Sequence, residues 1–372
     1  MSSSPADAPG PAGNVATVSE HEAPRLAHLT TLRVGGPARR HIRAETVDEL
    51  VAAVREADDA GEPVLVLGGG SNLLVADEGV PGVVVQVATS GVRPDPESLS
   101  DLCGGVMVTV AAGESWDAFV EVAVTLGWVG VEALSGIPGS VGATPVQNVG
   151  AYGQEVSDTV ARVRTWDRVE GRERTFAAAD CGFGYRTSRF KREPGRWVVL
   201  EVTFQLEVGD LGRPVRYGEL ARRLGVEAQQ RPPLADVREA VLALRAGKGM
   251  VLDDDDPDTW SAGSFFTNPV LEADEAARLP EDAPRFEQPD GTVKTSAAWL
   301  IEHAGFAKGW GGHLTEGRAS LSTKHTLALT NRDEATAADL LTVAGAVRDG
   351  VREAYGITLV NEPVLVGCEL PG

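Results

Sequence analysis

A stretch of glycines set among apolar residues constrains this chain more than any other feature. Between Ser135 and Gly153 the sequence reads SGIPGSVGATPVQNVGAYG. So many glycines exclude an ordinary helix or strand, and the apolar residues between them exclude a flexible linker. We therefore expect a rigid loop whose exposed main-chain N–H groups face an anionic ligand.

A second glycine loop, Gly68-Gly69-Gly70-Ser71-Asn72, follows a short apolar run at 63–67 that predicts a buried strand. Glycines there let main-chain N–H groups approach a pyrophosphate closely. No Gly-Lys-Ser/Thr follows, so it is not a Walker loop, and Leu73 stands where a Rossmann fingerprint needs its third glycine. Taken alone, a tight turn is as good an interpretation as a site. The two loops together indicate a dinucleotide held by main chain.

The length of 372 residues predicts more than one domain, because a single hydrophobic core stops growing at about 250–300 residues. In the first half, a capping box at Thr46 opens a helix that ends by Gly61, and Ser115 caps another that ends at Gly127. Strands are expected at 63–67, 83–87, 106–112, 160–166 and 197–207. The second half predicts helices at 234–246, 295–304 and 333–354, with strands at 263–267, 325–330 and 357–366. This order favours an α+β protein with a boundary between 205 and 220.

The charge of the chain bears on its partners. The formal net charge is −20, which disfavours nucleic acid and anionic membranes. No apolar run is long enough to span a membrane. Residues 1–24, rich in Ser, Pro, Ala and Gly, resemble a disordered tail and not a signal peptide.

Cysteine and histidine usage argues against disulfides and metals. The three cysteines, Cys103, Cys181 and Cys368, are widely spaced, no CxxC occurs, and the six histidines lack ligand spacing. We expect a reducing, cytoplasmic compartment and no metal site. A run of aspartates, 253–256 followed by Asp258, predicts a solvated loop, since calcium would need a ligand spacing and a turn glycine that the run lacks.

Three short strings in separate regions carry side chains suited to chemistry. They are Gly184-Tyr185-Arg186-Thr187-Ser188, Ala262-Gly263-Ser264-Phe265-Phe266-Thr267-Asn268-Pro269 and Asn361-Glu362-Pro363. Taken alone, each has a structural interpretation: Arg186 as a surface ion pair, Ser264 as a strand hydroxyl, and Glu362 as a solvated carboxylate.

The glycine loops also carry a family resemblance. The strings LGGGSNLLV at 67–75 and LSGIPGSVGATPVQNVGAYGQE at 134–155 closely resemble UDP-N-acetylenolpyruvoylglucosamine reductases, and the segment 30–38 resembles the N-terminal segment of that family. The resemblance begins near residue 26, after a disordered tail that we place over 1–25. It implies a two-part FAD-binding domain of the vanillyl-alcohol-oxidase (PCMH) type over 26–210. An α+β substrate-binding domain would follow over 211–372.

The same resemblance implies that both loops wrap a non-covalently bound FAD. The residues expected to bind it are Gly68, Gly69, Gly70, Ser71, Asn72, Leu73, Ser135, Gly136, Ile137, Pro138, Gly139, Ser140, Gly142, Ala143, Gln147, Asn148, Gly150, Ala151 and Tyr152.

The family's reaction implies roles for the three strings. NADPH reduces FAD, and the reduced flavin then delivers hydride to an enolpyruvyl ether of UDP-N-acetylglucosamine, giving UDP-N-acetylmuramate for peptidoglycan. By resemblance the catalytic residues are Arg186, Ser264 and Glu362. A guanidinium and a protonated carboxylic acid would stabilise charge on the substrate carboxylate, and Ser264 would supply a proton.

Four further positions match substrate-binding residues of the family: Lys248 for the UDP pyrophosphate, Tyr217 closing over the substrate, Asn268, and Lys294. NADPH and the UDP sugar would share one cleft in turn, and no obligate protein partner is implied. One alternative is a flavin oxidase of the same superfamily, against which the Ser264 and Glu362 strings argue. Another is a non-catalytic nucleotide-sugar or flavin-binding protein, which should lack one of the three catalytic residues.

Overall fold

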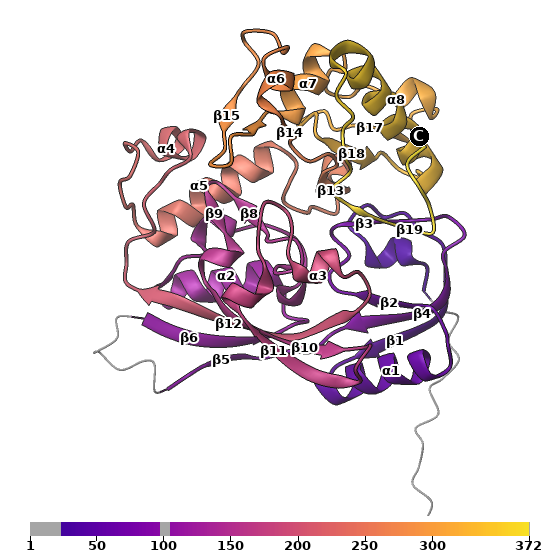
Figure 1. Ribbon diagram of the computed structural model, residues 1–372, viewed down its shortest axis with the longest axis vertical. Coiled ribbons are helices and arrows are strands. Elements are labelled where there is room, and N and C mark those ends of the chain that lie inside the picture. Colours follow the sequence, from indigo (N-terminus) through magenta and orange to yellow (C-terminus); the bar gives the residue numbers. More distant parts are fainter. Residues whose placement is uncertain (1–23, 97–104, 372) are drawn as a thin grey trace, which may run out of the picture.

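The computed structural model describes residues 24–96 and 105–371. Figure 1 shows two layers of structure: the first half of the chain forms the lower part around two sheets, and the second half lies above it. Residues 1–23 of the predicted tail and Cys103 lie outside the described residues, whereas Arg25, at the end of the predicted tail, forms an isolated bridge with Pro37. Within them, no helix is long and apolar enough to cross a membrane.

A parallel three-stranded sheet begins the first half, in the order β1 (Ala38–Ala44), β4 (Val80–Val87) and β2 (Val64–Leu67). Val83, Val84 and Val85 are fully buried, because both faces of this sheet are covered. Helix α1 (Val47–Asp59) packs along it and starts at the predicted capping box, where Thr46 Oγ1 accepts from the N–H of Glu49.

An antiparallel sheet forms the rest of the first half. Its order is β11 (Arg172–Ala177), β10 (Val160–Asp167), β12 (Trp197–Val208), β6 (Gly105–Ala111) and β5 (Val92–Pro94), with β7 (Trp128–Val129) also paired to β12. Helix α2 (Trp116–Thr125), capped by Ser115 as predicted, buries Trp116 and Phe119 against Phe204 of β12. Rings packed in this way stabilise the sheet beneath the site by burying large apolar surfaces.

The second half has a separate core. Strands β13 (Ser261–Ser264), β18 (Ala328–Asn331) and β17 (Ala319–Leu321) form one antiparallel sheet, and β14 (Val270–Leu271), β16 (Val293–Lys294) and β15 (Phe286–Glu287) form another. Helices α6 (Ala273–Ala276), α7 (Ala297–His303) and α8 (Ala337–Tyr355) surround them. The α+β class that the sequence predicts is confirmed.

Several contacts join the halves, and two of them lie next to the candidate site. Strand β19 (Val364–Val366) runs parallel to β3 (Leu73–Val75), directly after the first glycine loop. Helices α4 (Gly218–Leu224) and α5 (Leu234–Gly247) bury Val237 and Val241 in a small cluster that includes Ala133 of the first half. The proposed division near residue 210 stays a prediction.

Two sequence-based expectations are wrong in detail. The strand expected over 357–366 is only Val364–Val366, because Pro363 offers no N–H to a ladder; before it, the buried Leu359 packs from an irregular segment. The aspartate run is not simply solvated. Asp258 is buried, accepts from Ser322 and Thr323, and pairs with Arg332.

Candidate functional site

The two glycine loops face each other across the site. A Cβ on Gly69 would lie 2.6 Å from Cα of Gly139, and one on Gly68 would lie 2.5 Å from Oγ of Ser140. Real Cβ atoms do not approach other atoms this closely, so this contact requires glycine at 68 and 69. Asn72 fastens the loops together, because its Nδ2 donates to Oε1 of Gln147 at 2.8 Å.

A central cavity of about 340 Å³ lies between these loops and the second half of the chain. It is lined by all three predicted catalytic residues, Arg186, Ser264 and Glu362. The predicted cofactor-binding residues that line it are Gly68, Gly69, Gly70, Ser71, Asn72, Leu73, Ile137, Pro138, Gly139, Ser140, Ala143, Gln147 and Gly150. Sequence positions far apart therefore meet at one site.

The remaining residues predicted to bind the cofactor do not line the central cavity. Ser135 is fully buried and donates to the carbonyl of Glu132. The N–H of Gly136 donates to Asp117, and a Cβ on Gly142 would meet Ala112. The positions that do not line the central cavity are Ser135, Gly136, Gly142, Asn148, Ala151 and Tyr152. They shape the second loop from behind, and direct contact with a cofactor stays a prediction for them.

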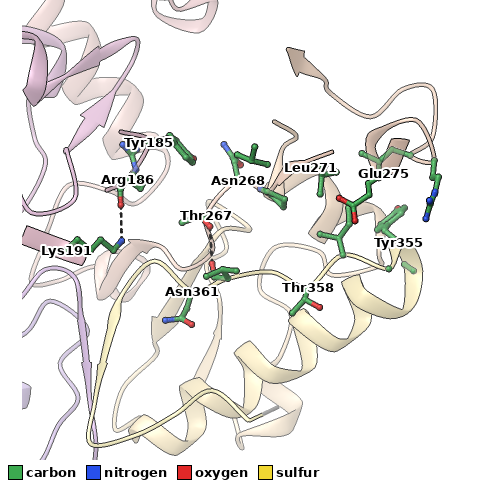
Figure 2. A pocket seen from close by; sticks show the side chains of 18 residues that line it. Tyr185, Arg186, Lys191, Thr267, Asn268, Leu271, Glu275, Tyr355, Thr358 and Asn361 are labelled. Atoms are coloured by element: carbon green, nitrogen blue, oxygen red, sulfur yellow. Dashed lines mark hydrogen bonds between the residues drawn. The ribbon is translucent and has the colours of Figure 1, made fainter. Parts of the chain in front are cut away.

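Two further cavities adjoin the central one. An outer cavity of about 840 Å³ shares Gly68 and Gly69 with it and extends past Thr30 and Arg33. A side cavity of about 660 Å³ shares Arg186 and Lys191 and extends to Tyr355 at the end of α8 (Figure 2). The combined space suits elongated ligands such as dinucleotides and nucleotide sugars.

Main-chain contacts bring the three chemical strings together. The N–H of Glu362 donates to the carbonyl of Phe265 at 2.8 Å, so Glu362 lies beside Ser264, the last residue of β13. Nε of Arg186 lies 3.3 Å from Oε1 of Glu362, and Nε2 of Gln147 donates to the same oxygen at 3.3 Å. Arg186 also donates to the carbonyl of Gly150 at 2.7 Å.

The environment of Glu362 favours its neutral form. Burial raises the pKa of this carboxyl above its ordinary value, although the positive charges of Arg186 and Lys191 lower it. A carboxyl with a raised pKa can hold a proton near neutral pH and donate a hydrogen bond. The cavity thus places a fixed cation beside a potential acid.

Arg245 is a site residue that we did not single out from the sequence. It lines the central cavity, is 9% exposed, and its pKa is lowered to about 10, mainly by burial. Its Nη2 donates to the carbonyl of Met250, but its Nε has no partner among the described residues. Burial of a guanidinium is costly without a counter-ion, and Arg245 lines the cavity between the glycine loops, so the cavity fits a cofactor that carries an anionic pyrophosphate. The sequence does carry a signal for the burial of Arg245, because it lies on the same helical face as Leu234, Val237 and Val241.

Lys191 is a second such residue. It lines both the central and the side cavity, and its Nζ donates to the main-chain carbonyl of Arg186 at 3.1 Å. Within the described residues, no cluster of His, Cys, Asp and Glu could hold a metal ion.

The four predicted substrate-binding residues form two separate groups. The ring of Tyr217 packs edge-on against that of Tyr152 at 5.5 Å, and Nζ of Lys248 lies 5.8 Å from the Tyr152 ring and donates to Glu219 at 2.6 Å. The other group borders the side cavity. Asn268 lines that cavity together with Tyr185 (Figure 2), and Nζ of Lys294 lies 4.7 Å from the Tyr185 ring.

Comparisons with known proteins agree with this arrangement. A model of the C-terminal domain of UDP-N-acetylenolpyruvoylglucosamine reductases matches residues 255–366, and a model of an FAD-binding domain matches residues 38–176. A UDP-N-acetylenolpyruvoylglucosamine reductase from Cutibacterium acnes is 60% identical over 358 residues, 96% of this chain and 93% of the relative. One from Streptomyces coelicolor is 56% identical over 361 residues, 94% of this chain and 91% of that relative.

A solved structure agrees with these matches. The crystal structure of a UDP-N-acetylenolpyruvylglucosamine reductase from Thermus caldophilus aligns with a TM-score of 0.59 at 28% identity, covering 92% of this chain and 97% of that one.

Proposed function

Because the chain belongs to the UDP-N-acetylenolpyruvoylglucosamine reductase family, we propose that Arg186, Ser264 and Glu362 carry out its reaction. The protein is an FAD-dependent oxidoreductase that reduces the enolpyruvyl ether of UDP-N-acetylglucosamine, with NADPH as reductant, in peptidoglycan synthesis. The observation that best supports the assignment is the Arg186–Glu362 ion pair, in a cavity lined by both glycine loops and Ser264.

The glycine loops and Arg245 would hold the cofactor. Main-chain N–H groups around Gly69 and Gly139 can approach a pyrophosphate closely, and the guanidinium of Arg245, which lines the cavity, offers it a positive charge. Bound FAD would accept two electrons from NADPH and supply them to the substrate. No histidine or cysteine occurs within 68–72 or 136–142, so we expect the flavin to be non-covalent.

Arg186 and Glu362 act on the substrate carboxylate. When the double bond of the enolpyruvyl group is reduced at its terminal carbon, negative charge builds on the conjugated carboxylate as an enediolate. The guanidinium of Arg186 stabilises that charge, and a protonated Glu362 donates a hydrogen bond to it. Both interactions strengthen as charge develops, so they lower the barrier more than they tighten substrate binding.

Ser264 supplies the proton that completes the reduction. The carbon next to the carboxylate needs a proton once the enediolate has formed, and a hydroxyl held at the end of β13 beside Glu362 can deliver one. Serine is a weak acid, so the hydroxyl works within the polar network of Glu362 and Gln147.

The two groups of predicted substrate-binding residues would hold the ends of the UDP sugar. Lys248 offers a positive charge to the pyrophosphate, and Tyr217 closes over it from α4. Asn268 lines the side cavity, and Lys294 lies against the ring of Tyr185, which also lines it. NADPH and the UDP sugar would use this cleft in turn, and the sparse, widely spaced cysteines favour a cytoplasmic enzyme. A net charge of −20 argues against a nucleic-acid partner.

Absorbance spectroscopy tests the whole assignment. The purified protein should be yellow and release FAD on denaturation. Anaerobic NADPH should bleach the flavin, and the enolpyruvyl UDP sugar should restore its colour without oxygen. A flavin oxidase would regain colour only with oxygen and consume it, and a binding protein would not react with NADPH. FMN, covalent flavin or no flavin would overturn the fold of the site.

A further inference from the structure

Lys191 lies where the central and side cavities meet. Its side chain is half-buried and lines both spaces. Figure 2 shows it reaching toward Arg186, with the dashed line marking the hydrogen bond from Nζ to the main-chain carbonyl of that residue, 3.1 Å long. Burying an ammonium costs free energy unless it is hydrogen-bonded or paired, and here the hydrogen bond goes to the main chain of a predicted catalytic residue.

The local structure fixes this lysine firmly. Ser188 caps the short helix α3 (Arg189–Arg192), since its Oγ accepts from the N–H groups of Phe190 and Lys191. The same hydroxyl donates to the carbonyl of Val146 in the second glycine loop at 2.5 Å. Phe190 is 5% exposed and anchors the helix in the core. Lys191 therefore reaches back to Arg186 from a base that is tied to the cofactor loop.

Arg186 needs such support. Its φ is +50°, a left-handed conformation that is unfavourable for a residue with a side chain. It sits in a tight turn closed by hydrogen bonds between Gly184 and Thr187. Strained residues persist at functional sites when their surroundings hold them in place, and the Lys191 hydrogen bond holds the carbonyl of the strained residue itself.

We propose that Lys191 is a positioning residue, which holds Arg186 in its productive conformation and keeps a second positive charge beside Glu362. This rests on the proposed roles of Arg186 and Glu362. Holding the guanidinium matters because a displacement of about 1 Å at a catalytic group can cost about 10²-fold in rate.

The charge of Lys191 also acts on Glu362. The titratable groups that act on this carboxyl are the guanidinium of Arg186, the ammonium of Lys191 and the phenol of Tyr185, and the amide of Gln147 donates to it. Burial raises the pKa of Glu362, and the two cations oppose that rise. Loss of the lysine charge should therefore raise the pKa of Glu362 further, although the charge of Arg186 still opposes that rise.

The experiment compares Lys191→Met, Lys191→Arg and Arg192→Met in the FAD-loaded enzyme. Arg192 is the matched control: it follows Lys191 on α3 and donates to the carbonyl of Gly182, but it lines neither cavity. Rapid mixing measures the oxidation of reduced flavin by the enolpyruvyl UDP sugar across pH. Lys191→Met should lower the limiting rate by about 10²-fold with a smaller change in the apparent Michaelis constant, and should move the Glu362 limb of the pH profile to higher pH.

The conservative variant Lys191→Arg distinguishes a positioning role of Lys191 from a purely structural one. Lys191→Arg should recover most of the rate and the wild-type limb, and Arg192→Met should behave as wild type. The proposal is wrong if Lys191→Met keeps the wild-type rate and pH profile, or if it loses only thermal stability. Should Lys191→Met fail to retain flavin, Lys191→Gln, which keeps a hydrogen-bond donor without the charge, must still show the shifted limb.

Arg186→Met separates this proposal from the proposed function. If Arg186→Met leaves the rate intact, the assignment of Arg186 fails. If Arg186→Met abolishes turnover and Lys191→Met does not change it, only the role of Lys191 fails.

Discussion

Nε of Arg186 lies 3.3 Å from Oε1 of Glu362, and yet the pKa of Glu362 is raised. Burial outweighs the neighbouring cations, so the carboxyl is held ready to carry a proton beside a permanent positive charge. An acid and a cation side by side suit a substrate whose carboxylate gains charge during the reaction.

The pH dependence of flavin oxidation should report Glu362. The protonated form is the active one, so the rate should be highest at low pH and fall as pH rises through the raised pKa. Glu362→Gln keeps a neutral donor that cannot ionise, so its rate should be lower and flat over the same range. Rapid mixing with the UDP sugar measures both. The same falling limb in Glu362→Gln would assign the titration to another group.

Ser264→Ala should separate the two half-reactions. Flavin reduction by NADPH needs no proton from Ser264 and should stay within a few-fold of wild type. Oxidation by the UDP sugar needs that proton and should slow by about 10²–10⁴-fold, without matching loss of substrate binding. Ser264→Cys should retain part of the rate, because a thiol also donates a proton. Equal slowing of both halves would make the serine a pocket-shaping residue.

Lys248→Ala should mainly raise the apparent Michaelis constant for the UDP sugar, because it removes a charge that binds substrate and transition state alike. Flavin reduction by NADPH should suffer less. Glu219, which pairs with Lys248 at 2.6 Å, provides the control: Glu219→Gln removes a competing anion and should not raise that constant. An unchanged constant in Lys248→Ala would place the pyrophosphate elsewhere.

Arg245→Met should weaken FAD binding. The substitution removes a guanidinium that lines the cavity between the glycine loops, so the pyrophosphate loses a favourable charge; a hydrogen bond to a charged group is worth about 1.5–3 kcal/mol. The measurement is the flavin-to-protein absorbance ratio during dialysis, compared with Arg223→Met on the exposed face of α4. A full complement of tightly held flavin in Arg245→Met would show that the loops suffice.

Asp258→Ala should destabilise the fold by about 3 kcal/mol, because it leaves the half-buried Arg332 and three donors of Ser322 and Thr323 without their partner. Burial alone would raise the pKa of Asp258, but its hydrogen bonds and Arg332 hold it below the ordinary value. Its contribution is therefore present above the carboxyl's ordinary pKa and is lost as pH falls through the lowered one. Urea unfolding across acidic pH checks this, with the exposed Asp255→Ala as control; parallel curves for wild type and Asp258→Ala would contradict it.

Local signals in the sequence predict much of the molecule. The Thr46 and Ser115 caps start their helices where expected, because capping depends on neighbours within one turn. Contacts between distant segments cannot be predicted in this way. No residue close to Glu362 in the sequence indicates that Asn72 and Gln147 lie beside it. The role of Lys191 could not be predicted for another reason: α3 has only four residues and is too short to show a periodic buried face.

The pairing of β19 with β3 also bears on how the enzyme is made. Strand β3 leaves the ribosome long before Val364–Val366 are translated, so its edge stays open through most of synthesis. Glu362 is translated just before that strand and after both glycine loops. Its contacts with Gln147 and Arg186 can therefore form only after most of the chain has been made.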